Sequence, residues 1–306
     1  MVSYGDPPRR MSDSREMGNK IMKLFQFYKD GAPSLGIRTG AGWIDAAAES
    51  RGRGIPAPQT MLDCIRGGEE ALAALRALMD GAELLHEEPQ LAPAVTGGEK
   101  ILCIGLNYRK HIEETNDVLP SYTVVFSKLG NALAASGEEI RLDPAYSRYD
   151  YEAELVLVIG KAGAWIPEEE AMDYVFGYTC GNDVSNRETQ LERGSQWLLG
   201  KSMDGFGPVG PCVVTAEELD PDHTGIRSRV NGELRQDSDT CHMIFSCRKI
   251  ISYISEHMTL KPGDIIFTGT PEGVALGQNG EKQWLRPGDL CSVEIDGIGE
   301  LVNRFV

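Results

Sequence analysis

The sequence has no long hydrophobic run. The chain is 306 residues long, and its longest apolar stretch is far shorter than the ~20 residues that a membrane-spanning helix needs. The first twenty residues also lack the apolar segment of a secretory signal peptide. These two absences predict a cytoplasmic protein without a membrane partner.

Basic residues are scarce relative to acidic ones. The chain has 30 Lys and Arg against 46 Asp and Glu, which gives a net charge of −16, and it contains no run of basic residues. Binding to nucleic acid or to an anionic membrane needs positive charge. The composition therefore argues against nucleic-acid and anionic-membrane partners.

Closely spaced cysteines are also missing. The seven cysteines form neither a CxxC pair nor a dense framework, so free thiols in a reducing compartment are expected rather than disulfides or structural zinc. The glycine-rich stretch LLGKSMDGFGPVGP lacks the spacing of a phosphate-binding loop, which argues against nucleotide binding.

The pattern of turns and apolar runs divides the chain into three parts. Residues 1–20 are polar and aperiodic, so we expect a flexible extension. Residues 22–90 contain the strand candidates MKLFQFY, SLGIRT and WIDAAA, followed by an amphipathic helix at about 68–80. A segment rich in Pro and Gly at 88–99 suggests a boundary. We therefore expect a small N-terminal α/β domain, and a second domain over 96–306.

The second domain reads mostly as strands. One helix is expected at about 246–256, and two Pro-Gly-Asp turns each lead into an apolar strand near the C-terminal end. Many strands with few helices predict an α+β, strand-rich fold with a roll or barrel.

Two glutamates open the stretch DYEAELVLVIG. Side chains alternate along a strand, so Glu152 and Glu154 share a face and lie where an apolar strand enters the core. Unpaired charges there cost several kcal/mol each, so a cation is expected beside them. The alternative is a strand start that still lies in water.

A third carboxylate, Asp183, follows the apolar run YVFGYTCG. Three carboxylates from two strand ends, without a competing His or Cys ligand pattern, describe a site for Mg²⁺ or Mn²⁺ rather than zinc. Asp is also common in turns, and that alternative stays open.

Other polar residues could take part in chemistry. His111 and Glu114 are three positions apart, so on a helical turn they would face the same side and could pass a proton. Lys201 could attract an anionic substrate, and the amides of Gly269 and Thr270 could bind a carboxylate. A solvated surface pair, a solvated lysine and an ordinary turn are the respective alternatives.

Taken together, eight segments resemble the fumarylacetoacetate hydrolase family, in order over residues 100–306. They are GLNYRKHIEE, FSK, YEAELVLVIGK, VFGYTCGNDVSNR, QWLLGKSMDGFGPVGP, VNGELRQDSDTCHMIFS, ISYISEHMTLKPGDIIFTGTPEGV and LRPGDLCSVEIDGIGELVN. The resemblance implies a mixed β-roll catalytic domain that forms a homodimer. It also implies that the chain belongs to the longer bacterial-type subgroup of the family, in which a small N-terminal domain precedes the roll.

The resemblance also implies roles for individual residues. The family's metal ligands fall on Glu152, Glu154 and Asp183, and Mg²⁺ or Mn²⁺ is expected, with Ca²⁺ as a further candidate. The remaining positions are a lid dyad at His111 and Glu114, a lysine at Lys201, and substrate-site residues at Arg187, Gln190 and Thr270. The sequence departs from the pattern at Cys241-His242 and at Asn186.

The activity implied is metal-dependent cleavage of a carbon–carbon bond in a 2,4-dioxo acid, with a small anionic 2-oxo acid as ligand. The same enolate arises in an isomerase of a hydroxymuconate-type diacid and in an oxaloacetate decarboxylase, which are the alternatives within enzymes. A catalytically inactive binding protein is the alternative from another class.

Overall fold

The computed structural model describes residues 22–306, so the predicted flexible extension at 1–20 lies outside the described residues. The described chain begins with three antiparallel strands, β1 (Lys23–Lys29), β2 (Ala32–Thr39) and β3 (Gly42–Asp45). A tight turn at Asp30 and Gly31, both with positive φ, joins the first two. The small meander expected from the sequence is confirmed.

Two helices follow, α1 (Ala46–Arg53) and α2 (Met61–Met79). The strand predicted through Ala46 to Ala48 is wrong, because the Asp45 side chain accepts a hydrogen bond from the Ala48 amide at 2.8 Å and begins a helix. Helix α2 is longer than the predicted 68–80. Thr60 caps it, and Gly68 at φ 53° breaks the regular periodicity that the sequence pattern relies on.

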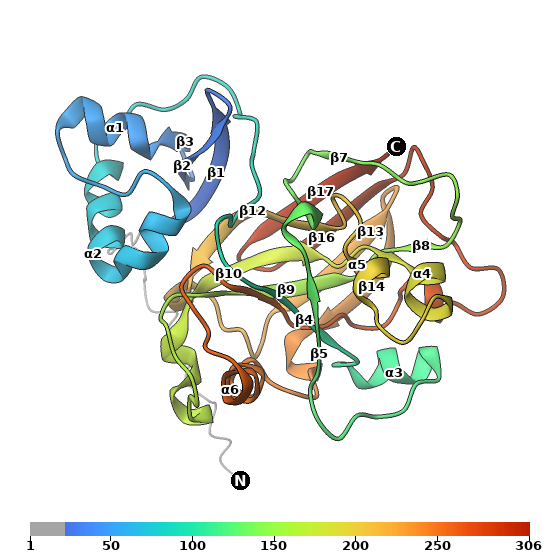
Figure 1. Cartoon of the computed structure of the whole chain (residues 1–306). Coiled ribbons are helices and arrows are strands. Elements are labelled where there is room, and N and C mark those ends of the chain that lie inside the picture. Colours follow the sequence, from blue (N-terminus) through green and yellow to red (C-terminus); the bar gives the residue numbers. More distant parts are fainter. Residues whose placement is uncertain (1–21) are drawn as a thin grey trace, which may run out of the picture.

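The largest sheet runs through most of the molecule (Figure 1). Its strand order is β3-β2-β1-β12-β10-β9-β15-β4-β5, with β6 beside β12. Its remaining strands are β4 (Ile101–Gly105), β5 (Val124–Lys128), β6 (Leu133–Ala134), β9 (Ala153–Ile159), β10 (Val175–Asn182), β12 (Gly207–Thr215) and β15 (Ile265–Phe267). Because β15 is parallel to β4 and antiparallel to β9, the sheet is mixed.

A second sheet has the order β14-β13-β16-β17-β7, and β8 pairs with β11 separately. These strands are β7 (Glu139–Ile140), β8 (Tyr149–Asp150), β11 (Ser185–Asn186), β13 (Gly225–Val230), β14 (Glu233–Asp239), β16 (Leu290–Ile295) and β17 (Gly299–Phe305). The α+β, strand-rich class with mixed sheets is thus confirmed.

The remaining helices are short. They are α3 (Arg109–Thr115), α4 (Arg187–Glu192), α5 (Leu198–Lys201) and α6 (Cys247–His257), with the 3₁₀ turns η1 (Gly130–Ala132), η2 (Glu168–Tyr174), η3 (Ala216–Glu218), η4 (Thr240–His242) and η5 (Ala275–Gly277). Helix α6 confirms the helix expected at 246–256, and Ser246 caps it.

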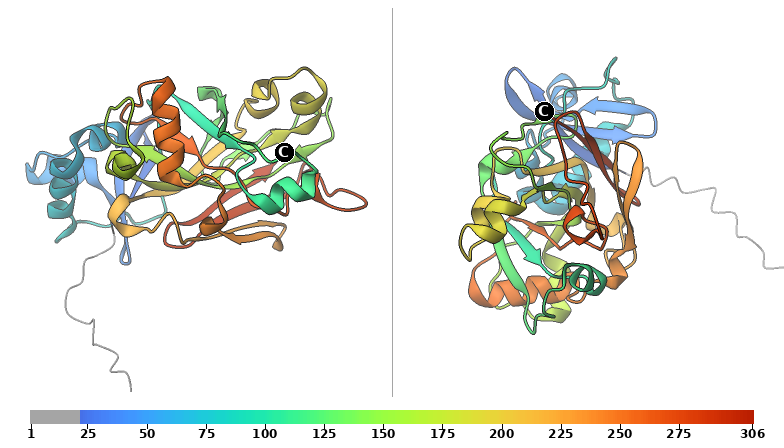
Figure 2. Two further views of the ribbon diagram at one scale, coloured as in Figure 1. Left: turned by 90° about the horizontal axis from the view of Figure 1, so that it is seen from below. Right: turned by 90° about the vertical axis from the view of Figure 1, so that its right-hand side faces the viewer.

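The N-terminal strands share a sheet and a core with the rest of the chain. Strand β1 pairs with β12, and Leu24 and Leu75 lie in one buried cluster with Val156 and Phe267. Figure 2 shows this N-terminal part at one end of the molecule, continuous with the larger part. The division near 88–99 into two folding units stays a prediction.

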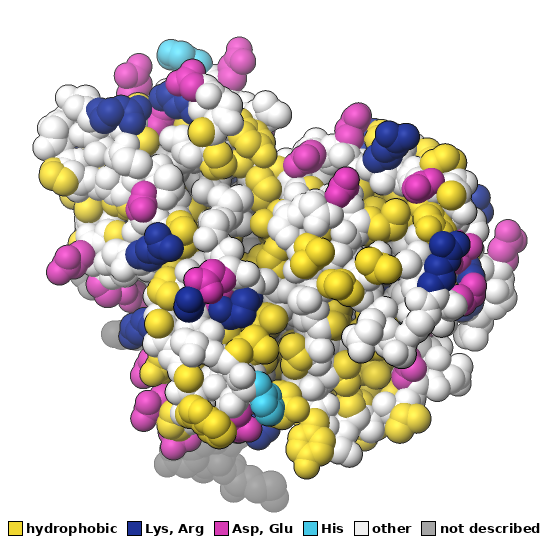
Figure 3. Space-filling model, in the orientation of Figure 1, with side chains coloured by type: hydrophobic (Ala, Val, Ile, Leu, Met, Phe, Trp, Pro, Cys, Tyr) yellow, Lys and Arg dark blue, Asp and Glu magenta, His cyan; other side chains and the backbone are white. Residues whose placement is uncertain are grey.

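The surface carries interspersed charges. Acidic and basic side chains lie scattered among uncharged ones on the face drawn in Figure 3. Within residues 22–306, no helix has the length and apolar character needed to cross a membrane.

Candidate active centre

Antiparallel pairing of β9 with β10 brings the predicted metal ligands together. Because Glu154 lies opposite Gly181, the start of β9 adjoins the end of β10, where Asp183 follows. Ligand oxygens of Glu152, Glu154 and Asp183 lie within 4.8 Å of one another, and all three side chains are buried. Strand β9 is buried along its whole length, as its apolar sequence predicted.

Three buried cations of the protein itself contact these carboxylates. The Lys201 ammonium donates to Glu152 at 2.7 Å and to Asp183 at 2.9 Å. Lys128 lies 2.5 Å from the other Asp183 oxygen, and Arg187 donates to Glu152 at 2.6 Å. The cation expected beside the glutamates is thus supplied in part by side chains.

Sequence reasoning gave no role to Lys128, although it stands in the family-like stretch FSK. Its ammonium also donates to the carbonyl oxygens of Val184 at 3.2 Å and Phe206 at 2.7 Å, and to that of Lys201. It therefore joins β5 to the chain segments that hold Asp183 and Lys201. A lysine that ends an apolar strand candidate, in an acidic chain, is the signal that could have indicated it.

Glu154 is the carboxylate left without a cation. In the described part of the chain its side chain accepts a hydrogen bond from the Gly269 amide at 2.7 Å and forms no ion pair. Burial raises the pKa of Glu154 well above its ordinary value, and repulsion from Asp183 and Glu152 adds to the effect. For Glu152, burial also raises the pKa, but Lys201 and Arg187 outweigh burial and lower it.

Charge counting shows what the cluster can accept. Within residues 22–306, Asp150, Glu152 and Asp183 pair with Lys128, Lys201 and Arg187, so with all four carboxylates ionised one negative charge is left, on Glu154. The remaining negative charge and the closely spaced carboxylate oxygens suit the binding of a hard divalent cation. With such a cation the cluster would carry one positive charge, which suits a bound carboxylate.

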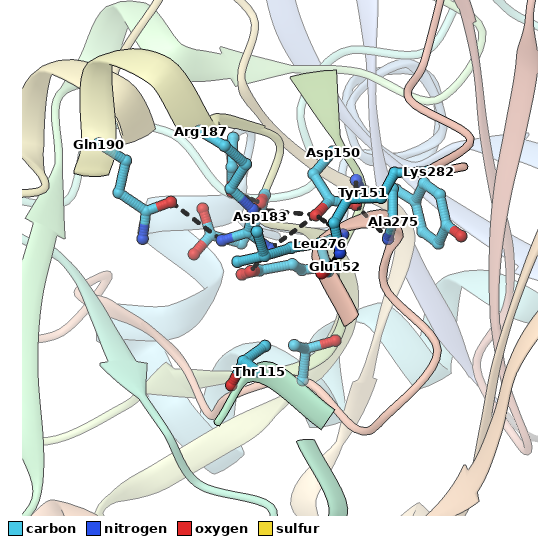
Figure 4. Close-up of polar contacts among 12 residues, drawn as sticks. Thr115, Asp150, Tyr151, Glu152, Asp183, Arg187, Gln190, Ala275, Leu276 and Lys282 are labelled. Carbon is cyan, nitrogen blue, oxygen red and sulfur yellow. Dashed lines mark hydrogen bonds and ion pairs between the residues drawn. The ribbon is translucent and has the colours of Figure 1, made fainter. Parts of the chain in front are cut away.

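Asp150 is a second residue that sequence reasoning left without a role. It accepts hydrogen bonds from Arg187 Nε at 2.9 Å, from the Ala275 amide at 2.7 Å and from the Leu276 amide at 2.9 Å (Figure 4). Because Arg187 also contacts Glu152, Asp150 links the carboxylate cluster to η5.

The predicted dyad is formed on helix α3. His111 Nδ1 lies 2.9 Å from Glu114 Oε1, and the other Glu114 oxygen accepts a hydrogen bond from the Gly273 amide at 2.9 Å. A Cβ at Gly277 would lie 2.2 Å from the carboxyl carbon of Glu114, so a larger residue there would displace this carboxylate. The segment that holds Asp150 therefore also fixes the dyad.

One cavity lies between His111 of the dyad and two glutamates of the cluster. His111, Glu152, Glu154, Arg187 and Lys201 line it. Its apolar wall comes from Ile104, Leu106, Phe126, Leu191, Trp197 and Leu276. An apolar wall lowers the local dielectric constant and so strengthens the electrostatic effect of the charged groups on a bound substrate.

Three of the four predicted substrate-binding residues, Arg187, Gln190 and Thr270, line the cavity. Arg187 donates to Gln190 at 2.9 Å, and the Thr270 hydroxyl donates to the Ala153 carbonyl at 2.9 Å. The fourth, Gly269, is not among the lining residues, and its amide binds Glu154. The substrate roles of these four residues stay predictions.

Replacing Asp150 by asparagine should destabilise the fold. The change removes a buried charge that pairs with Arg187, so we expect the free energy of unfolding to fall by about 3 kcal/mol or more. Urea unfolding measures the loss. Glu192→Gln is the control, because this glutamate pairs with Arg148 at the surface and should cost less than ~1 kcal/mol. Equal stability of the two variants would refute the linking role.

Metal binding should release a proton from Glu154. The pKa of Glu154 in the folded protein is raised above the ordinary 4.5. At a pH between 4.5 and this raised pKa, the carboxyl is protonated in the folded protein and must lose its proton to bind a cation. Affinity for Mn²⁺ should therefore increase as pH rises through this window. Calorimetry in two buffers of different ionisation enthalpy measures the release. A heat independent of the buffer would contradict it.

A family model, fumarylacetoacetate (FAA) hydrolase C-terminal, matches residues 100–306. The oxaloacetate tautomerase fahd2, mitochondrial, of Xenopus laevis is 38% identical over 308 residues, which cover 98% of this chain and 94% of that protein. The family resemblance found in the sequence is thus confirmed.

Two solved structures are similar to this fold. Fumarylpyruvate hydrolase from Pseudomonas aeruginosa, in complex with Mn²⁺ and pyruvate, is 36% identical with a TM-score of 0.62, over 72% of this chain and 94% of that one. Maleylpyruvate hydrolase from Sphingobium sp. SYK-6, with manganese(II) and pyruvate, is 29% identical with a TM-score of 0.76, over 93% and 99% of the chains. The chain belongs to the fumarylacetoacetate hydrolase family, and its own buried acidic cluster could hold a metal ion.

Proposed function

We propose that this protein is a metal-dependent tautomerase of a 2-oxo diacid such as oxaloacetate, moving a proton on the carbon beside the 2-oxo group. The observation that carries the proposal is one cavity lined both by His111, the ring of which contacts Glu114, and by Glu152 and Glu154 of the carboxylate cluster. The similarity to an oxaloacetate tautomerase extends over 98% of this chain, so it includes the N-terminal part.

The metal ion would be Mg²⁺ or Mn²⁺, held by Glu152, Glu154 and Asp183 through hard oxygen donors. Ca²⁺ is a less favoured candidate, because it takes about six to eight oxygen ligands. The cation, when bound, supplies Lewis-acid stabilisation of the negative charge that develops on the 2-oxo oxygen. The Mn²⁺ and pyruvate in two structurally similar hydrolases support this choice.

The dyad would transfer the proton. A carboxylate hydrogen-bonded to Nδ1 fixes the histidine tautomer and leaves Nε2 free to accept or return a proton. Glu114 is itself held by the Gly273 amide, so the ring of His111 is oriented before a substrate arrives. Such a positioned base contributes about 10²–10⁴-fold to the rate.

Lys201 and Arg187 would favour the anionic forms of substrate and product. Both line the cavity, and their charges are held in place by Glu152. Attraction of Lys201 to Asp183 and Glu152 outweighs burial and keeps the pKa of Lys201 raised, so the ammonium stays charged. A fixed cation costs no reorganisation when negative charge develops nearby.

Hydrolysis of an acylpyruvate is the second candidate, and the sequence alone ranked it first. Its support is the pyruvate found in two similar hydrolases, because cleavage of such a substrate leaves the enolate of pyruvate. The dyad would then activate a water for attack on the distal carbonyl, with Lys201 favouring the oxyanion. Decarboxylation would pass through the same enolate without that water.

Parallel assays separate these reactions. Enol-oxaloacetate and a panel of acylpyruvates are incubated with the Mg²⁺-loaded protein in ¹⁸O-labelled water, and products are identified by ultraviolet absorbance and mass spectrometry. A tautomerase converts enol-oxaloacetate into keto-oxaloacetate and forms no cleaved, labelled product. Labelled carboxylic acid from an acylpyruvate, with no acceleration of the enol-oxaloacetate conversion, would replace the proposal by hydrolysis.

Two expectations about context stay predictions. Homodimerisation rests on the family resemblance, and the described chain is a single copy. A cytoplasmic location is likewise untested, and the similar Xenopus protein carries the word mitochondrial in its name.

A further inference from the structure

A second group of metal-ligating side chains lies away from the carboxylate cluster. His223, Asp239 and Cys241 offer a nitrogen, an oxygen and a sulfur that lie within 4.8 Å of one another. We call them the His223 cluster. Cys241 is one of the positions at which the sequence departs from the family pattern, and the proposed reaction does not use it. We propose that the His223 cluster binds Zn²⁺.

The donor set favours this class of cation. Zn²⁺ is borderline in softness and accepts thiolate, imidazole and carboxylate together, whereas Mg²⁺ and Ca²⁺ select oxygen alone. Three protein ligands leave the fourth tetrahedral position for water or another small ligand. The cluster therefore differs in chemistry from Glu152, Glu154 and Asp183.

Backbone contacts fix the two segments that carry the ligands. The Thr240 amide donates to the Thr224 carbonyl at 3.0 Å, and the Thr224 amide donates to the Thr240 hydroxyl at 2.9 Å. One Asp239 oxygen accepts a hydrogen bond from the Cys241 amide at 2.8 Å. Because the neighbours Thr224 and Thr240 are also buried, little further ordering is needed for a cation to bind.

The exposure of the ligands gives a cation access from solvent. His223 and Cys241 are exposed and Asp239 is partly buried. All seven cysteines lie in the described part of the chain, and the other six are buried. Cys241 is therefore the thiol that both Zn²⁺ and a thiol reagent can reach in the folded protein.

The position of the cluster suggests what bound Zn²⁺ would do. The segment after η4 is joined to the residues just before α3, since Met243 pairs with Tyr108 and the Ile244 amide donates to the Asn107 carbonyl at 2.8 Å. Zn²⁺ would brace η4 against the loop that carries His223, and so support this segment beside the dyad helix. The effect is structural, so turnover does not require it.

Cobalt titration tests the site with a readout independent of activity. Co²⁺ replaces Zn²⁺, and a thiolate ligand gives an intense sulfur-to-cobalt charge-transfer band that an all-oxygen site cannot give. The titration uses the full-length protein with Mg²⁺ saturating the carboxylate cluster. We expect the band at stoichiometric Co²⁺, its loss in Cys241→Ser, and at least about 10-fold weaker binding in His223→Ala, because even residues that only support a ligand contribute that much.

The control is His86→Ala, which removes an exposed histidine far along the chain and should leave the band unchanged. A second measurement follows alkylation of Cys241, since the free thiolate is the nucleophile. Zn²⁺ should slow labelling at least about 10-fold, because a metal-bound thiolate is withdrawn from reaction, and EDTA should restore the rate. Absence of the band, its persistence in Cys241→Ser, or labelling unaffected by Zn²⁺ would overturn the proposal.

Discussion

Replacing His111 by alanine should lower kcat by about 10²–10⁴-fold, because a positioned proton-transfer group contributes that much to the rate. Binding of Mn²⁺ and pyruvate should survive, since His111 makes no ion pair with Glu152, Glu154 or Asp183. Steady-state kinetics on enol-oxaloacetate and calorimetry with Mn²⁺ and pyruvate measure the two effects separately.

The partner of His111 provides an internal check. Glu114→Gln keeps an oxygen for the Gly273 amide but loses the charge that fixes the ring, so it should also lose activity. The double variant should be little worse than either single one, because residues that act as one unit are not additive. His86→Ala is the control. Near-normal turnover in His111→Ala would refute the proton-transfer role.

Glu154→Gln should abolish tight metal binding without damaging the fold. Glutamine has nearly the same shape and can still accept the hydrogen bond from Gly269. The variant removes the one carboxylate of the cluster that has no ion pair among the described residues, so no buried cation loses a partner. We expect the metal-free variant to be at least as stable as the wild type, since the carboxyl that it replaces is buried without an ion pair among the described residues.

Asp183→Asn is the matched contrast. Asp183 pairs with both Lys128 and Lys201, so its loss should remove metal binding and also destabilise the fold by about 3–5 kcal/mol. Thermal unfolding with and without Mg²⁺ measures both properties. The wild type should gain stability from the ion by mass action, and neither variant should. Unchanged Mn²⁺ affinity in Glu154→Gln would exclude Glu154 as a ligand.

The sequence indicated most of the active centre because its signals are local. The approach of Glu152 and Glu154 to Asp183 follows from strand alternation and the antiparallel pairing of two apolar strands. The spacing of His111 and Glu114 requires only one helical turn. Such features depend on short stretches of chain, which residue patterns describe well.

The parts that sequence reasoning missed depend on long-range contacts. Lys128 reaches Asp183 across 55 positions of sequence, and Asp150 binds amides of η5 more than a hundred positions away. No local period marks such partners. The same limit explains why the ion pairs of Lys128, Lys201 and Arg187 with the carboxylates were not predicted from the sequence.

In the N-terminal part, local signals competed. The run WIDAAA reads as apolar strand, yet the cap formed by Asp45 directs Ala46 and its successors into helix α1. Pairing of β1 with β12, which joins this part to the main sheet, leaves no trace in the pattern of either strand. Sheet membership is decided by partners that lie far apart in sequence.

We propose that a metal ion is held by Glu152, Glu154 and Asp183. His111 then transfers a proton at the carbon beside the 2-oxo group of the bound substrate. Proton NMR of pyruvate in D₂O tests it most directly, because exchange of the methyl hydrogens requires the enolate but no bond cleavage. We expect the Mg²⁺-loaded wild type to exchange these hydrogens faster than buffer with Mg²⁺ alone, and we expect EDTA, Glu154→Gln and His111→Ala each to abolish this acceleration. Exchange by the Mg²⁺-loaded wild type no faster than in buffer with Mg²⁺ alone would contradict it.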